Sequence, residues 1–215
     1  MLIPIGDDQV KGGYRPWLTY VLIVANVLIF LVQTFVPEAD GLIAHAMVPG
    51  EVVMGVDLYA MITSMFLHGS WIHLIGNMLF LWIFGDNIEA TVGTGTFFLF
   101  YLIGGLFASV AQIMIDMHSA IPVLGASGAI AALMGAYMIM FPKSRIRMIL
   151  LWFPIPFRVT AWVFFAFYVW GQLTGFMGST IEGGGVAYGA HLGGLAIGAV
   201  AGWNWRVRTE SVSLG

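Results

Sequence analysis

Four polar side chains in this sequence have the types and spacing needed for nucleophilic catalysis. Ser127 lies in the stretch GASGAI and His191 in AHLGGLAIG, each within a long apolar run. Serine is a poor nucleophile at neutral pH, so it needs a base such as histidine within hydrogen-bond reach. His73 and Asn77 are four residues apart and share one helix face, where both could donate to a developing oxyanion. The backbone N–H of Ser127 is a third candidate donor.

The composition places these residues in a membrane protein. Of the 215 residues, 60% are hydrophobic and 9% are charged, and the mean hydropathy is +0.92. Soluble domains carry roughly 25% charged residues, so a lipid bilayer is the environment that this chain fits. The net charge of -3 and the few scattered basic residues argue against nucleic acid as a partner. The chain has no cysteine and therefore no disulfide.

Six apolar stretches approach the ~20 residues that a membrane-spanning helix needs. We expect spans at about 17–36, 71–88, 96–115, 123–141, 159–176 and 186–205. They predict an all-α membrane protein with one domain over residues 1–215. The connection 37–70 is partly apolar but interrupted by glycine and proline, so we expect an interfacial or re-entrant segment there. The basic, proline-rich stretch 142–158 is expected to form a loop at the lipid headgroups.

Basic residues give the expected orientation, because Lys and Arg stay on the cytoplasmic side of short loops. With six spans, both termini and the loop between the fourth and fifth spans share one side. All eight basic residues fall there: Lys11, Arg15, Lys143, Arg145, Arg147, Arg158, Arg206 and Arg208. The opposite loops carry only acidic charges: Glu38, Asp40, Glu51, Asp57, Asp116 and Glu182. Both termini are therefore expected in the cytoplasm, and the short termini suggest a prokaryotic plasma membrane.

This orientation brings the four polar side chains to one depth. At 1.5 Å per residue, Ser127 is expected ~6 Å along the fourth span and His191 ~8 Å along the sixth. His73 and Asn77 fall in the first two turns of the second span. All four therefore lie in the outer third of the bilayer, where water can enter. The sixth span also has a face of small residues that permits close packing against the fourth, consisting of Gly194, Gly198 and Gly202.

Taken singly, these residues have structural explanations. A serine or asparagine in a membrane helix more often bonds to its own or a neighbouring helix, and a lone histidine is as often a packing or proton-relay group. Gln112 and Gln172 are expected to bond helix to helix, and His45 and His68 to lie at the membrane interface. A metal site that combines His68 with the histidines of the spans would lack any carboxylate, so we expect neither metal nor cofactor.

Two other functions suit a small membrane protein. A relative that binds membrane helices without cutting them would be expected to lack Ser127 or His191, and both are present. A transporter would need ionisable groups near the bilayer midplane, and the middle of these spans contains no Asp, Glu, Lys or Arg. The four residues at one depth therefore favour hydrolysis of a peptide bond in or near a membrane segment of another protein.

These motifs resemble those of the rhomboid family of intramembrane serine proteases. The matching pieces are GASG with Ser127, HLIGN with His73 and Asn77, FGDNIE at 84–89, and AHLGGLAIG with His191. Their order and their placement on the second, fourth and sixth spans also match. The resemblance covers essentially the whole chain, in the family's minimal six-span form.

The resemblance implies Ser127 as the nucleophile and His191 as the general base. It implies an oxyanion pocket formed by His73, Asn77, the Ser127 amide and Gly125. The connection 37–70 would be a hairpin in the outer leaflet. The fifth span and the 177–185 loop would form a lateral gate for single-span membrane protein substrates.

The sequence departs from the family's pattern at two places. Many members carry a Trp-Arg pair in the hairpin, where this chain has Tyr59-Ala60. Some members place an aromatic residue four positions after the serine, where it packs on the histidine, and this chain has Ala131 there. Because no Asp or Glu lies inside the last three spans, the site would be a Ser–His dyad. Packing or a neutral group must then orient His191.

Overall fold

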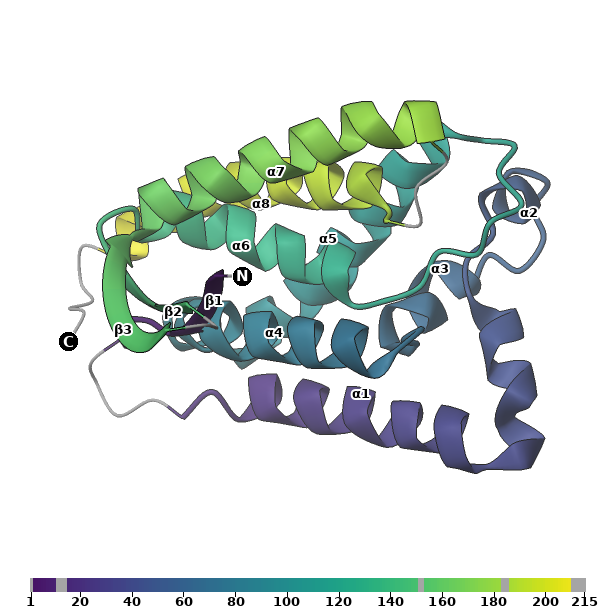
Figure 1. Cartoon of the computed structure of the whole chain (residues 1–215), viewed down its shortest axis with the longest axis horizontal. Helices are drawn as coiled ribbons and strands as arrows, with labels where there is room; N and C mark the ends of the chain where they lie inside the picture. Colours follow the sequence, from purple (N-terminus) through teal and green to yellow (C-terminus); the bar gives the residue numbers. More distant parts are fainter. Residues whose placement is uncertain (1, 11–14, 151–152, 183–185, 210–215) are drawn as a thin grey trace.

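Six long helices occupy the positions of the six predicted spans. They are α1 (Trp17–Phe35), α4 (Trp71–Val92), α5 (Thr94–Ile115), α6 (Ser127–Met140), α7 (Ala161–Glu182) and α8 (Tyr188–Thr209). The computed structural model describes residues 2–10, 15–150, 153–182 and 186–209, so the predicted cytoplasmic Lys11 lies outside the described residues. Figure 1 shows the helices running side by side as a bundle.

Length and composition support two or three membrane crossings within the described residues. α1 and α5 are long and apolar enough to cross a bilayer. A third crossing is possible if α4 is joined with the short helical segment Ala60–Phe66, which meets it at 93°. α6 has only 14 residues, and α8 is rich in glycine. The arrangement with six crossings therefore stays a prediction.

α6 begins later than predicted. Val123, the expected start of the fourth span, instead pairs with Met47: its N–H donates to the Met47 carbonyl at 2.7 Å, and the Met47 N–H donates back at 3.1 Å. Gly125 then has φ +122°, a backbone conformation that a helix cannot contain. Ser127 is thus the first residue of its helix, and the expectation of a place ~6 Å along a helix was wrong.

α6 is the central helix of the bundle because its neighbours reach its backbone. It packs against α4, α5 and α8, and every residue from Gly128 to Tyr137 is buried. The predicted small face of α8 makes the closest approach. A Cβ added at Gly202 would lie 2.6 Å from the Ala136 carbonyl oxygen, and one at Gly198 would lie 2.8 Å from the Ala132 carbonyl carbon. Close packing through these glycines is therefore confirmed.

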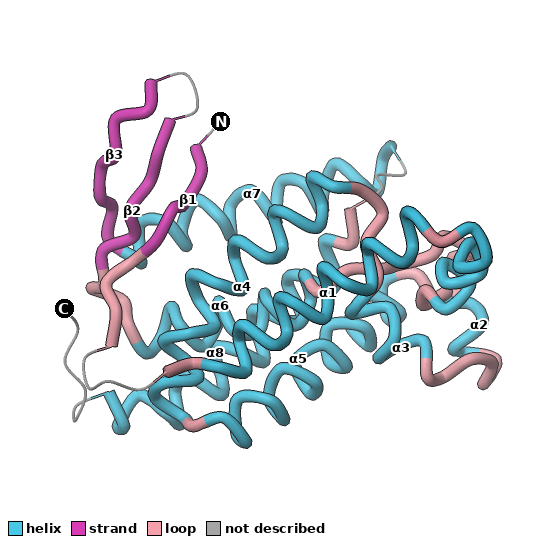
Figure 2. Tube along the Cα trace, turned by 90° about the horizontal axis from the view of Figure 1, so that it is seen from below, coloured by secondary structure: helices cyan, strands magenta, loops and turns pink. Residues whose placement is uncertain are grey.

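The stretch 142–158 is not a loop at the headgroups, and the fold is not purely α. Three antiparallel strands form a sheet in the order β1-β2-β3, consisting of β1 (Leu2–Gly6), β2 (Arg145–Leu150) and β3 (Phe153–Thr160). The sheet lies at one end of the helices (Figure 2). β2 alternates exposed arginine with buried Ile146 and Met148, as a half-buried strand does. The prolines within the strands, Pro4, Pro154 and Pro156, lie on the edge strands, where a missing N–H is tolerated.

The connection between α1 and α4 consists of short helical turns. These are η1 (Pro37–His45), α2 (Pro49–Val53), α3 (Ala60–Thr63) and η2 (Ser64–Phe66). Tyr59 is hydrogen-bonded through its hydroxyl to Nδ1 of His45 at 3.0 Å, and Ala60 is almost fully buried. The connection is thus held together with Tyr59-Ala60 in place of a Trp-Arg pair. Its position as an interfacial hairpin stays a prediction.

Buried polar groups join the helices at the sheet end. α1 has no side-chain cap of its own, and Glu89 of α4 supplies one. Its carboxylate accepts from the N–H groups of Leu18 and Thr19, at 3.2 and 2.8 Å, and from the Thr19 hydroxyl at 2.8 Å. Asp7, which follows β1, accepts from Asn87 at 2.7 Å and from the Tyr137 hydroxyl.

Candidate active site

Ser127 and His191 meet across the contact between α6 and α8. Nε2 of His191 lies 2.8 Å from Oγ of Ser127, and both side chains are half-buried. Ser127 is the first residue of α6, and His191 lies in the first turn of α8. Gly194 permits this approach, since a Cβ there would lie 3.0 Å from the Ala131 side chain and 3.1 Å from the Ala132 nitrogen. The structure therefore brings the two predicted residues into hydrogen-bond contact.

His73, Asn77 and Gly125 lie together next to Ser127. A Cβ added at Gly125 would lie 2.7 Å from Cε1 and Nε2 of His73 and 3.4 Å from Nδ2 of Asn77. The N–H of Gly125 donates to the Ser64 carbonyl at 2.8 Å, which fixes the loop before α6. The first N–H groups of α6 have no acceptor within the helix and attract negative charge. The side chains of α4 and the start of α6 can thus donate to the same anion.

His68 completes this group, although it was predicted only to lie at the membrane interface. It is only 2% exposed, and its Nε2 lies 2.9 Å from Nδ2 of Asn77, so it contacts the site, whereas its depth in the membrane stays a prediction. An amide nitrogen can only donate, so Nε2 of His68 accepts and carries no proton. The Asn77 amide therefore donates one of its two N–H groups to His68, and its second N–H stays available for another acceptor. Gly69 and Ser70, which caps α4, mark the turn after this residue, but no sequence pattern shows that the His68 side chain is buried.

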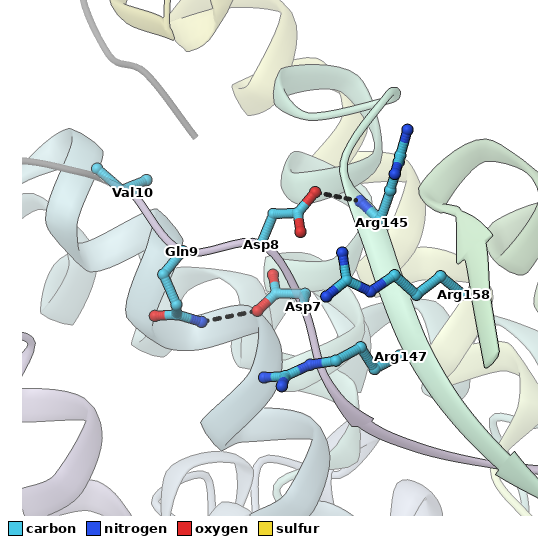
Figure 3. Close-up of a pocket in the computed structure, with 7 residues that line it drawn as sticks. All are labelled: Asp7, Asp8, Gln9, Val10, Arg145, Arg147 and Arg158. Carbon is cyan, nitrogen blue, oxygen red and sulfur yellow. Dashed lines mark hydrogen bonds between the residues drawn. The ribbon is translucent and has the colours of Figure 1, made fainter. Parts of the chain in front are cut away.

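A small cavity adjoins Ser127. Its volume is about 30 Å³, and its lining includes Ser64, Gly125, Ser127 and Ala190. A cavity of this size with polar partners can hold a water molecule. A much larger cavity, of about 550 Å³, lies beside the sheet, and Figure 3 shows three arginines and two aspartates around it. The larger cavity lies beyond the far end of α6, about 20 Å from Ser127 along the helix, and takes no part in this site.

The second ring nitrogen of His191 also has a neutral partner. Nδ1 lies 2.7 Å from Oε1 of Gln172 in α7. Both expected glutamine bonds between helices are confirmed, since Gln112 of α5 accepts from the N–H of Ala190 in α8 at 3.1 Å. The requirement for a neutral orienting group, which followed from the missing carboxylate, is thus met by Gln172.

An aromatic ring contacts His191 from its own helix. The Tyr188 ring lies edge-on to the imidazole, with centroids 6.5 Å apart and planes at 80°. Ala131 is fully buried against Gly194, so an aromatic side chain has no room there. Tyr188 was not among the residues predicted from the sequence. Its position three residues before His191, on the same helix face, is the signal that could have found it.

Comparison with known proteins agrees with this geometry. A profile of the Rhomboid domain matches residues 56–207. The chain is 35% identical over 149 residues to "Rhomboid protein 1, mitochondrial" of Saccharomyces cerevisiae, which covers 67% of this chain and 41% of the yeast protein. It is 30% identical over 138 residues to "Rhomboid protease GluP" of Bacillus subtilis, covering 61% of this chain and 26% of that protein.

A third relative matches more of the chain at lower identity. "Rhomboid protease GlpG" of Salmonella choleraesuis is 23% identical over 181 residues, which cover 84% of this chain and 60% of that protein. The chain thus spans between about a quarter and three fifths of the length of these three relatives.

Proposed function

The chain belongs to the rhomboid family, and on that premise we propose that it is an intramembrane serine protease. It would hydrolyse peptide bonds in or near transmembrane segments of membrane proteins through a dyad of Ser127 and His191. The observation that carries this proposal is the contact of 2.8 Å between Oγ of Ser127 and Nε2 of His191. Rhomboid proteases are serine endopeptidases of the membrane, which agrees with a site built from membrane helices.

The proposed reaction begins at Ser127. Its Oγ attacks the peptide carbonyl while its proton moves to Nε2 of His191. The oxyanion accepts hydrogen bonds from His73, Asn77 and the Ser127 backbone N–H, beside Gly125. His191 then gives the proton to the leaving amine, which departs and leaves an acyl-enzyme on Ser127. A water molecule, deprotonated by His191, hydrolyses that ester and restores the serine.

The substrates proposed are single-span membrane proteins in the lipid bilayer. A regular helix hides its carbonyls in hydrogen bonds, so we propose cleavage where small or helix-breaking residues loosen it. α7 and the following segment to residue 185 would be the lateral gate, of which residues 183–185 lie outside the described residues.

We further propose six crossings with both termini cytoplasmic. The start of α1, the sheet and the end of α8 lie at one end of the bundle (Figure 1), and Ser127 begins α6 at the other. The basic residues of the sheet are thus remote from the site, which supports a site that opens to the extracytoplasmic side. The two bacterial relatives favour a prokaryotic plasma membrane, whereas the yeast relative is mitochondrial by name.

The test uses the full chain in liposomes with a single-span substrate. We expect the wild type to cleave it and to react with a fluorophosphonate probe, because both reactions need an activated serine. Ser127→Ala and His191→Ala should each abolish cleavage, and Ser127→Ala should abolish labelling. Ser119→Ala, in the loop before α6, is the matched control and should retain both. Cleavage by folded Ser127→Ala protein would end the proposal, and a wild type that binds substrate without labelling or cleavage would be a non-cleaving relative.

A further inference from the structure

The role of Gln172 follows from what a catalytic base requires. Nε2 of His191 can accept the serine proton only if the ring proton sits on Nδ1. Nδ1 lies 2.7 Å from Oε1 of Gln172, and an amide oxygen can only accept. This bond therefore selects the tautomer with the proton on Nδ1 and leaves the lone pair of Nε2 directed at Ser127. In the opposite tautomer, Nε2–H would donate to Oγ, and the serine could not be activated.

Gln172 reaches His191 from a different helix than the one that holds Ser127. It lies on α7, whereas His191 lies on α8 and Ser127 on α6. α7 lies at the edge of the bundle in Figure 1 and packs against α8. The bond to Nδ1 can therefore form only while α7 is seated on α8 near residue 191.

A second contact fixes that seating. Gly175 lies one turn beyond Gln172 on α7, and a Cβ there would meet the Tyr188 ring, with Oη at 2.8 Å and ring carbons closer. Tyr188 in turn lies edge-on to His191. Gln172 and Gly175 therefore both place α7 against the immediate surroundings of the imidazole, one by a hydrogen bond and the other by a close fit.

We propose that Gln172 is a positioning residue that holds His191 in its basic tautomer, so that the dyad is competent only while α7 is seated against α8. The proposal rests on the proposed proteolytic function and adds a regulation of that same site. Displacement of α7 by an entering substrate would leave the base unoriented until α7 returns. Within the described residues, the groups that face His191 are His73 of α4, Ser127 of α6, Gln172 of α7 and Tyr188 of α8, with Gln112 of α5 beside its backbone.

The experiment measures kcat, KM and the pH dependence of cleavage in liposomes. Gln172→Leu should lower kcat by about 10- to 100-fold with little change in KM, because it removes the acceptor of the half-buried Nδ1–H of His191. The acid limb of the pH profile should move to lower pH, since the imidazolium loses an acceptor. Gln172→Glu keeps the acceptor and adds negative charge, so its acid limb should move to higher pH. Gln112→Leu is the matched control, because it removes a glutamine bond between helices without touching the imidazole.

A second pair of variants tests the seating of α7. Gly175→Ala forces either α7 or the Tyr188 ring to move, so it should lower kcat as Gln172→Leu does. Gly171→Ala is its control, because a Cβ there meets no atom within 4 Å, and it should behave as the wild type.

The outcomes separate the two proposals. A wild type that neither cleaves nor reacts with a fluorophosphonate would refute the proposed function itself. An active wild type with Gln172→Leu within threefold of it, or with an acid limb unmoved in both Gln172 variants, would overturn the positioning role. Equal losses of kcat in Gln172→Leu and Gln112→Leu would show that Gln172 contributes only to helix packing. A Gly175→Ala enzyme with the wild-type kcat would overturn the link to the seating of α7.

Discussion

Gly198→Ala tests whether the close approach of α6 and α8 sets the geometry of the dyad. Gly198 lies seven residues after His191, which is two turns along the same face of α8. Its nearest neighbours are backbone atoms of Ala132 in α6, with the carbonyl carbon 2.8 Å and Cα 3.0 Å from an added Cβ and the carbonyl oxygen closer still. Backbone cannot rotate away as a side chain can, so the added methyl group must separate the helices.

The size of the effect follows from these distances. An ordinary Cβ contact begins at 3.4 Å, so relief of the contact with the Ala132 carbonyl carbon alone requires about 0.6 Å of separation, and relief of the contact with the oxygen requires about 1.4 Å. A misplacement of about 1 Å can cost about 100-fold in rate, or about 2.7 kcal/mol of transition-state stabilisation. Because the strain arises two turns away from His191, we expect kcat to fall by about 10- to 100-fold. Overpacking should also lower the free energy of unfolding by about 1–3 kcal/mol.

The assay combines cleavage in liposomes with denaturant unfolding in detergent. Gly95→Ala in α5 is the control, since a Cβ there meets no atom within 4 Å, and it should change stability by less than about 1 kcal/mol. A Gly198→Ala protein with wild-type kcat and wild-type stability would refute the reasoning, because α6 and α8 would then tolerate a methyl group between their backbones. A loss of stability with full activity would show that the dyad does not depend on this contact.

Two further predictions concern the sheet end of the molecule. Burial raises the pKa of Asp7 from 3.8 to about 6, against hydrogen bonds from Tyr137, Asn87 and Gln9 that lower it. A carboxyl whose pKa is higher in the folded than in the unfolded protein contributes stability below about pH 4. That contribution is lost as the pH rises through about 6. The stability of Asp7→Asn relative to the wild type should therefore grow by up to about 3 kcal/mol from pH 4 to 7, and a constant difference in unfolding free energy would contradict this. Glu89→Ala should destabilise the protein by about 3 kcal/mol, because buried donors at the start of α1 lose their acceptor, whereas Glu51→Ala on α2 should change it by less than about 0.5 kcal/mol. Equal denaturation midpoints for these two variants would contradict the capping role of Glu89.

The helix positions were predictable because apolar runs and their breaks are local. Five of the six long helices begin within two residues of the predicted spans, α6 being the exception. Its start was missed because VLGASG reads as a continuation of apolar helix. The segment is extended because Met47 pairs with Val123 from 76 residues away, and a contact of that range leaves no local pattern.

The sheet was missed for a different reason. The sequence RIRMIL has the alternation of a half-buried strand, but its arginines and the neighbouring prolines favoured a headgroup loop. Pro4 and Pro156 lie on the edge strands, where a missing N–H is tolerated. The pairing of β1 with β2 joins residues that are more than 140 positions apart, which no window along the chain can detect.

The contact of Ser127 with His191 was predictable in kind because the small face of α8 points to the helix on which it packs. The partner of Nδ1 of His191 was not predictable, because it depends on the rotation and depth of α7. Gln172 is one of several polar residues on α7. It lies level with His191 and bonds to its imidazole, whereas Thr174 bonds back to the carbonyls of its own helix.

The two halves of the site differ in how firmly they are held. Ser127 and His191 lie on helices that pack backbone to backbone, so separating them would disrupt contacts along the whole length of α6. Gln172 lies on a helix whose outer face presents Trp162, Phe167 and Trp170, each at least 60% exposed, and lipid can cover these side chains equally well if α7 shifts. Because lipid removes the hydrophobic cost of such a shift, we expect that α7 can move while α6 and α8 stay in place. Under the proposed function, the nucleophile and base would stay together while only the orientation of the base changes.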